Sequence, residues 1–207
     1  MLNSQQSNNF DESQSPHYKA IENEFGRSEY KIALVSRASE SRNRVERFMY
    51  ESYQKHFSAE LKTFSPIILA VFKKSDHSIV SALGLSYADE GKLFSEAYLV
   101  ESIDQQIAQH ELIKVNRSKI IELNSFVIDK TINIKNVLPQ ICNFIKSLDV
   151  DWTVYTLTKI MKRYFHRFGI SLSFLSLAEQ SALQDSSDWG NYYNFEPAVY
   201  YSSVRRN

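Results

Sequence analysis

The amino-acid sequence predicts one α/β domain, in which helices cover both faces of a mixed central sheet. Short apolar runs of strand length alternate with segments of helical periodicity from residue 30 onward. One pair of strands is joined by a turn of hairpin length, which makes them antiparallel, whereas later strands are separated by helices, which permits parallel neighbours. No repeat, linker or low-complexity break interrupts residues 30–204, so this chain of 207 residues is expected to bury one core.

The first 28 residues differ from the rest in composition. They are rich in Ser, Gln, Asn and Glu and contain few apolar side chains. Burial of so few apolar groups cannot offset the entropy lost when the chain becomes ordered. We therefore expect a disordered N-terminal arm over residues 1–28 and a single domain over residues 29–207.

Periodicity then sets the expected elements in order. A strand at 30–36 precedes a helix at 40–57, in which Val45, Met49 and Tyr53 fall on one face. Two adjacent antiparallel strands follow, joined by the polar turn KSDHS. One or two short helices are expected at 93–112, and Gly169 ends a later helix. The remaining ranges are strands at 67–73, 79–88, 120–128, 152–158, 170–177 and 198–204 and helices at 137–148 and 159–168.

The charged residues are balanced, with 24 Lys and Arg against 24 Asp and Glu. A neutral chain has no overall field that would attract nucleic acid or an anionic membrane. The N-terminal residues lack a basic, apolar leader, and the longest apolar run is far shorter than the ~20 residues of a membrane span. We expect a cytoplasmic protein with no nucleic-acid partner and no stable membrane insertion.

Cysteine and histidine usage excludes several kinds of site. Cys142 cannot form an internal disulfide and lies in an apolar periodic segment, which is typical of a buried thiol in a reducing compartment. The sequence contains neither a nucleophile elbow nor a phosphate-binding loop. We expect no metal site and no covalent serine chemistry, because metal-ligand spacing is absent among the histidines, which are His17, His56, His77, His110 and His166.

The predicted central strand carries the most informative polar residues. Alternation along the segment IIELNSFVI directs Glu122 and Asn124 to one face of the sheet and Leu123 and Ser125 to the other. A carboxylate buried in such a strand has a raised pKa, which suits a general base that deprotonates an amine. The alternative is a glutamate that is paired or lies at the solvent end of the strand.

Three motifs in order give a resemblance to the family of thermostable hemolysins. They are LFSEAYL, IIELNSFV and WGNYY, and the similarity spans residues 42–202. The predicted element order resembles the GCN5-related N-acetyltransferase fold. The resemblance implies an enzyme that moves an acyl group from a thioester, either acyl-CoA or an acyl carrier protein, to a small-molecule amine. It also implies that no cofactor is tightly bound.

The segment IIELNSFVID is also similar to a motif of acyl-homoserine lactone synthases. Glu122, Phe126 and Asp129 match that motif, whereas Ser125 stands where those synthases have an arginine. The arginine, tryptophan and aspartate pattern of their N-terminal region is also missing. A homoserine lactone product is therefore not expected.

Three residues are candidates for the catalytic site, with Glu122 as the base or as the group that orients the substrate. Glu96 in LFSEAYL is a candidate carboxylate for recognising the amine, and its alternative is a glutamate favoured at a helix start. Related acetyltransferases use a tyrosine on the penultimate helix as general acid. Its usual place is Phe165 in this chain, so Tyr164, one residue away, is the candidate, with packing or surface exposure as its alternative.

The donor site is expected along the end of the central strand, where Phe126, Val127 and Ile128 hold the pantetheine arm. Acetyltransferases bind the coenzyme A pyrophosphate with a glycine-rich turn at a helix N-terminus. The corresponding segment here, DKTINIKNVLPQ, has no glycine. A donor bound to a carrier protein is therefore as consistent with the sequence as coenzyme A, and phosphate contacts fall to side chains such as Lys130, Asn133, Lys135 and Asn136.

Aromatic residues before the last strand are candidates for the wall of the substrate pocket. Trp189, Tyr192 and Tyr193 serve either that role or the core, and Asn124 and Asn191 are candidate hydrogen-bonding residues. Two other functions remain open. One is a binding module that has lost catalysis, since the glycine-rich loop and the usual tyrosine are missing. The other is a membrane-active toxin, which only the family name suggests.

Overall fold

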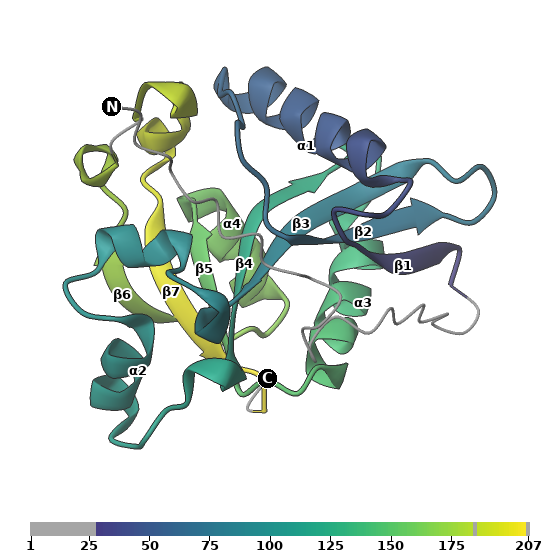
Figure 1. Ribbon diagram of the computed structural model, residues 1–207. Coiled ribbons are helices and arrows are strands. Elements are labelled where there is room, and N and C mark those ends of the chain that lie inside the picture. Colours follow the sequence, from purple (N-terminus) through teal and green to yellow (C-terminus); the bar gives the residue numbers. More distant parts are fainter. Residues whose placement is uncertain (1–27, 184–185, 206–207) are drawn as a thin grey trace, which may run out of the picture.

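The structure is a computed structural model that describes residues 28–183 and 186–205 (Figure 1). The predicted disordered arm lies outside the described residues except for Ser28.

Seven strands form one mixed sheet within the described residues, as the alternation of apolar runs predicts. The strand order is β1-β2-β3-β4-β5-β7-β6, and every neighbouring pair is antiparallel except β4 and β5, which are parallel. The strands are β1 (Tyr30–Val35), β2 (Ile67–Lys73), β3 (Ile79–Tyr87), β4 (Ile120–Ile128), β5 (Trp152–Leu157), β6 (Ser173–Leu177) and β7 (Ala198–Ser203).

The α-helices are α1 (Arg42–Phe57), α2 (Ile103–Glu111), α3 (Ile134–Ser147) and α4 (Lys159–Arg167). Helix α3 begins three residues before the predicted start because the Asn133 side chain caps it by accepting a hydrogen bond from the Lys135 N–H. The segment predicted as one or two short helices contains the 3₁₀ turn η3 (Phe94–Tyr98) and then α2. Strand β6 is shorter than predicted, since its first residue is Ser173 and not Ile170.

Helices cover both faces of the sheet, and this confirms the predicted layers (Figure 1). On one face, Val45 and Met49 of α1 pack on Ile68 of β2 in a shared cluster. On the other face, Ile141 and Phe144 of α3 share a cluster with β2 and β3 residues. Helix α2 lies on the same face as α1, and α4 lies on the same face as α3. No helix among the described residues is long and apolar enough to cross a membrane.

The two parallel strands at the centre of the sheet, β4 and β5, separate after a short paired stretch. Strands β4 and β5 pair only from Ile120 to Leu123, opposite Trp152 to Tyr155. Beyond this point β4 continues beside β3, while β5 continues beside β7. A bulge in β4 follows at once, because Ser125 and Phe126 together face the single residue Leu83 of β3. Ser125 has a φ of 49°, a left-handed conformation that redirects its side chain.

Candidate active site

Two cavities lie where β4 and β5 separate. The first, which we call the α3/α4 cavity, has a volume of about 300 Å³ and is lined mainly by apolar side chains from both helices and both strands. The second, which we call the η3 cavity, has a volume of about 720 Å³ and is lined by Glu122, Asn124, Phe94 and Trp189, among others. Four residues line both cavities and define their junction: Tyr53, Ser125, Thr156 and Tyr192.

The junction holds three buried hydroxyl groups, from Thr156, Tyr192 and Tyr53. The Thr156 Oγ1 is buried and has no hydrogen-bond partner among the described residues. The Tyr192 hydroxyl donates to the Thr156 carbonyl at 3.4 Å. Burial raises the pKa of Tyr53 well above its ordinary value, although a hydrogen bond with the Ser125 side chain lowers it in part. Tyr53 therefore keeps its proton at neutral pH.

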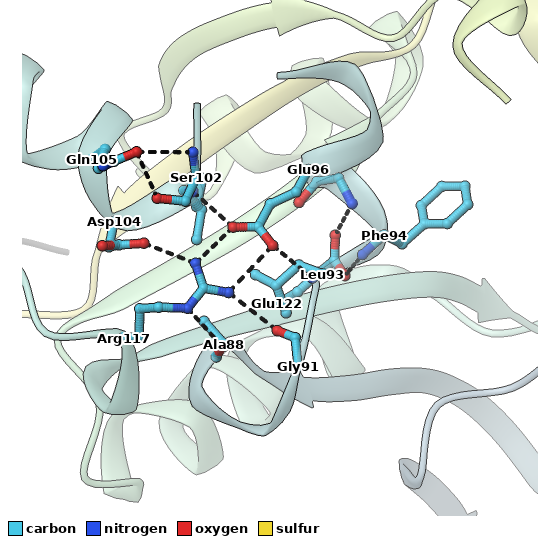
Figure 2. Close-up of polar contacts among 12 residues, drawn as sticks. Ala88, Gly91, Leu93, Phe94, Glu96, Ser102, Asp104, Gln105, Arg117 and Glu122 are labelled. Atoms are coloured by element: carbon cyan, nitrogen blue, oxygen red, sulfur yellow. Dashed lines mark hydrogen bonds and ion pairs between the residues drawn. The ribbon is translucent and has the colours of Figure 1, made fainter. Parts of the chain in front are cut away.

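Glu122 projects from β4 toward turn η3, with only 1% of its surface exposed. Its Oε1 accepts a hydrogen bond from the Ser95 N–H at 2.8 Å, and its Oε2 accepts one from the Phe94 N–H at 3.0 Å (Figure 2). Burial raises the pKa of Glu122, and these hydrogen bonds reduce the shift. The side chains of Ser95 and Asn124 also lie close enough to the carboxylate to lower this pKa.

Glu96 lies in the same turn but in a different environment. Arg117 donates to its Oε1 at 2.7 Å and to its Oε2 at 3.2 Å, and the Leu93 and Ile103 N–H groups each donate at 2.8 Å (Figure 2). Burial alone raises the pKa of Glu96, but the Arg117 guanidinium and the two N–H groups outweigh it, so the pKa is lowered. Glu96 does not line either cavity.

Arg117 joins the segments on which the turn rests. It also binds Asp104 at 2.8 Å and donates to the backbone carbonyls of Ala88 at 2.8 Å and Gly91 at 3.1 Å. We call Arg117, Glu96, Asp104, Ala88 and Gly91 the Arg117 cluster. The cluster connects the end of β3, turn η3 and the start of α2 (Figure 2). The cluster fixes the turn whose N–H groups hold Glu122.

Asn124 shares the face and the cavity of Glu122, as strand alternation predicts. Its Nδ2 donates to the Ser65 Oγ at 3.0 Å, and Ser86 donates to the same Ser65 oxygen at 3.1 Å. Gly84 makes room for this network, because a Cβ at that position would lie 2.2 Å from the Asn124 Oδ1. Ser125 departs from simple alternation, since the bulge lets it line both cavities.

The aromatic residues before β7 lie together around the η3 cavity. The rings of Trp189 and Tyr192 are 5.5 Å apart, and Trp189 also contacts Phe94 at 5.2 Å. Tyr193 does not line either cavity, and its hydroxyl is 2.6 Å from that of Tyr98. Asn191 is exposed and lines neither cavity, while its backbone N–H donates to the Phe57 carbonyl at 2.8 Å.

Of the residues predicted to hold the pantetheine arm, Phe126 lines the α3/α4 cavity. Val127 is buried against the α1 cluster, and Ile128 packs against the α3 cluster. The residues predicted to contact phosphate lie at the start of α3, outside both cavities. Asn133 caps that helix through its side chain, and the side chains of Lys130 and Lys135 are exposed.

Tyr164 lies on the outer surface of α4, with 36% of its surface exposed, and lines neither cavity. Phe165 occupies the cavity wall instead, with its ring 5.1 Å from that of Tyr155. Sequence reasoning assigned Tyr53 only to the apolar face of α1 and did not single out Thr156. The signal that could have identified Tyr53 is its hydroxyl on an otherwise apolar helix face, because a buried hydroxyl usually needs a hydrogen-bond partner.

The chain belongs to the thermostable hemolysin family, whose pattern matches residues 35–207. Among curated proteins, none matches the sequence at a significant level. Solved structures with a similar fold include MesI, described as a CoA-dependent acyl-homoserine lactone synthase, with 19% identity and a TM-score of 0.52. The alignment covers 84% of this chain and 88% of MesI.

Two further solved structures are similar in fold to this chain. FeeM, an N-acyl amino acid synthase from uncultured soil microbes, has 11% identity and a TM-score of 0.56 over 85% of this chain and 91% of FeeM. The arylalkylamine N-acetyltransferase 7 of the yellow fever mosquito has 10% identity and a TM-score of 0.55 over 84% of this chain and 87% of that protein. Because these identities are low, the likeness establishes the fold alone, which is like that of the GCN5-related N-acetyltransferases.

Proposed function

We propose that this member of the thermostable hemolysin family transfers an acyl group from a thioester to the amine of a small molecule. The observation that carries the proposal is the pair of cavities that meet where β4 and β5 separate. The apolar α3/α4 cavity suits an acyl chain and its pantetheine arm. The η3 cavity, which contains Glu122 and Asn124, suits a polar acceptor. Similar folds in N-acyltransferases support this assignment.

The reaction at the junction is a direct transfer. The amine nitrogen attacks the thioester carbonyl carbon, a C–N bond forms and the C–S bond breaks. The amine loses one proton to a base, and the departing thiolate gains one. Both substrates must be held with the reacting atoms in contact, and two cavities that share four lining residues provide this geometry.

Glu122 is the proposed base, or the group that orients the amine. Its carboxylate is buried, its pKa is raised and no cation among the described residues is bonded to it. A raised pKa increases its affinity for the amine proton compared with an exposed glutamate. The Phe94 and Ser95 N–H groups fix the carboxylate in the wall of the η3 cavity, where a substrate amine can reach it.

Tyr53 is the proposed proton donor to the thiolate. The usual tyrosine position on α4 is Phe165, and Tyr164 is directed toward solvent, whereas Tyr53 of α1 lines both cavities. Its raised pKa keeps the hydroxyl protonated and able to donate. Ser125, in the β4 bulge, lines the same junction, and we assign the N–H groups of the bulge to the thioester oxygen as it becomes negative.

We assign the remaining predicted residues according to their contacts. Glu96 positions turn η3, because Arg117 and two backbone N–H groups use its carboxylate. Asn124, Trp189 and Tyr192 line the acceptor pocket. Tyr193 supports that pocket through its hydrogen bond with Tyr98.

A binding module without catalysis is the second candidate. It is favoured by the outward position of Tyr164 and by the internal hydrogen bonds of Glu122. The two functions differ in outcome, since a module binds a thioester without forming an amide.

The test is to incubate the purified protein with octanoyl-CoA or octanoyl-loaded acyl carrier protein and a panel of amines and amino acids, and to detect amides by mass spectrometry. We expect an amide product and free thiol in equal amounts. Tight binding of a thioester, measured by thermal stabilisation, with no amide from any amine would support the binding module instead.

A further inference from the structure

Positive charge is concentrated on the two helices that flank the α3/α4 cavity. Helices α3 and α4 contain six lysines and arginines and not one aspartate or glutamate. The whole chain is neutral, so the rest of it carries six more acidic than basic residues. The six cations are Lys135, Lys146, Lys159, Lys162, Arg163 and Arg167, of which Lys159 is ion-paired with Glu196.

Helix α4 separates this charge from the cavity. Its Met161 and Phe165 line the α3/α4 cavity. Arg163 and Arg167 are exposed, and neither has an ion-pair partner among the described residues. Ile160, which is 50% exposed, lies on the outer surface with them. A surface that combines cations with exposed apolar side chains is typical of a site that docks another protein.

The cavity opens to solvent beside this surface. Pro139, Asn143 and Lys146 of α3 are exposed and also line the cavity, as does Gly169 just after α4. The mouth therefore lies between the two basic helices. A partner seated on them could extend a narrow prosthetic arm into the cavity.

The start of α3 is poorly suited to a coenzyme A pyrophosphate. The Asn133 side chain already accepts the Lys135 N–H at 3.0 Å, and the Asp129 carboxylate accepts the Thr131 N–H at 2.8 Å. Hydrogen bonds from Thr131 lower the pKa of Asp129, which is therefore ionised at neutral pH. Its negative charge and the absence of glycine disfavour a phosphate at this turn.

We propose that the exposed surface of α3 and α4 docks an acidic acyl carrier protein, which delivers the thioester through the cavity mouth. The inference rests on the proposed function, because it names the donor for that reaction. Complementary charge accelerates association and selects the partner. The basic residues contact the carrier surface, while the pantetheine arm and acyl chain occupy the α3/α4 cavity.

The test compares three octanoyl donors with the full-length protein: acidic acyl carrier protein, coenzyme A and pantetheine. The variant Arg163→Glu/Arg167→Glu reverses two charges outside the cavity. The control is Lys114→Glu, an exposed lysine remote from α3 and α4 in the sequence. Carrier binding is measured by fluorescence anisotropy at 50 and 300 mM salt, and kcat/KM is measured for each donor.

We expect the carrier to bind the wild-type protein, and the double variant to bind it about tenfold or more weakly at 50 mM salt. Raising the salt to 300 mM should weaken carrier binding to the wild type by a similar factor. The ratio of kcat/KM for carrier over pantetheine should fall by the same factor, and Lys114→Glu should behave as the wild type. Equal loss for pantetheine, or no effect on carrier binding, would overturn the inference. So would equal competition by single-stranded DNA, which would indicate a general polyanion surface.

Failure of this inference differs from failure of the proposed function. If coenzyme A and pantetheine thioesters are converted to amides but the carrier does not bind, acyl transfer stands and the docking surface is refuted. If the carrier binds with the expected charge dependence and no amide forms, the docking surface stands and acyl transfer is refuted.

Discussion

The Arg117 cluster and the cavity junction differ in how far their buried polar groups are paired within the protein. In the cluster, Arg117 pairs with both Glu96 and Asp104, and backbone groups take the remaining hydrogen bonds. Among the described residues, Thr156 Oγ1 at the junction and Ser95 Oγ in turn η3 have no hydrogen-bond partner, and Glu122 beside them has backbone N–H partners but no cation. This contrast indicates that burial alone does not identify a functional carboxylate. A buried polar group whose hydrogen bonds are not all made within the protein is the better indicator of a ligand site.

The largest effect on stability is expected from Arg117→Ala. The substitution leaves Glu96 and Asp104 without their cation inside a packed turn, which should destabilise the fold by about 3 kcal/mol. Urea unfolding followed by circular dichroism measures the change. A loss below about 1 kcal/mol would show that the cluster is not the scaffold of the turn. The matched control is Arg163→Ala, on the exposed surface of α4.

Tyr53→Phe tests the junction rather than the scaffold. Removal of the hydroxyl should lower kcat about tenfold, because proton donation to the thiolate then falls to water. Stability should change by less than about 1 kcal/mol, since the ring still fills its place. Tyr164→Phe provides the comparison and should leave kcat unchanged, as Tyr164 lines neither cavity. Loss of activity in Tyr164→Phe and not in Tyr53→Phe would reverse our assignment.

The two glutamates should affect pH stability in opposite directions. The pKa of Glu96 is lowered by its partners, so its contribution is present above its ordinary pKa and is lost as pH falls through its folded value. The pKa of Glu122 is raised, so its contribution is present below its ordinary pKa and is lost as pH rises through its folded value. The urea midpoint should be measured from pH 3 to 8. As the pH falls, the midpoint of Glu96→Gln should decrease less than that of the wild type. As the pH rises, the midpoint of Glu122→Gln should decrease less than that of the wild type. Parallel curves for both variants would contradict the comparison.

Thr156→Val should give the smallest change in stability. The hydroxyl has no hydrogen-bond partner within the part of the chain that the structure describes, so the unfolding free energy should fall by no more than about 0.5 kcal/mol or should increase. A ligand that bonds to Thr156 should bind more weakly, which would raise KM for the thioester. Calorimetry on both proteins checks stability and binding together, and strong destabilisation would reveal a hydrogen bond that the structure does not contain.

Sequence reasoning predicted the fold well because its signals are local. The order of strands and helices follows from apolar periodicity, and the shared face of Glu122 and Asn124 follows from strand alternation. The motif LFSEAYL marked the correct turn but not the contacts of Glu96, because Arg117 reaches it from 21 residues away in sequence. That distance is bridged only in the folded chain.

The junction was harder to predict for the same reason. Tyr53 reads as one more apolar position on α1, and its place between two cavities depends on how α1 crosses the sheet. The left-handed conformation of Ser125 depends on a bulge set by pairing with β3, which strand alternation cannot reveal. Tyr164 illustrates the opposite case, since helical periodicity alone indicated that it faces away from the usual site.

The most direct test of the central claim is kcat for amide formation in Glu122→Gln, with Glu96→Gln as the matched variant from the Arg117 cluster. We predict that Glu122→Gln lowers kcat by about 100-fold while the folded protein persists, because a glutamine cannot take the amine proton. Glu96→Gln should lower stability and retain most of its kcat under conditions where it is folded. Full activity in Glu122→Gln, measured on folded protein with an identified acyl donor and amine, would contradict the account.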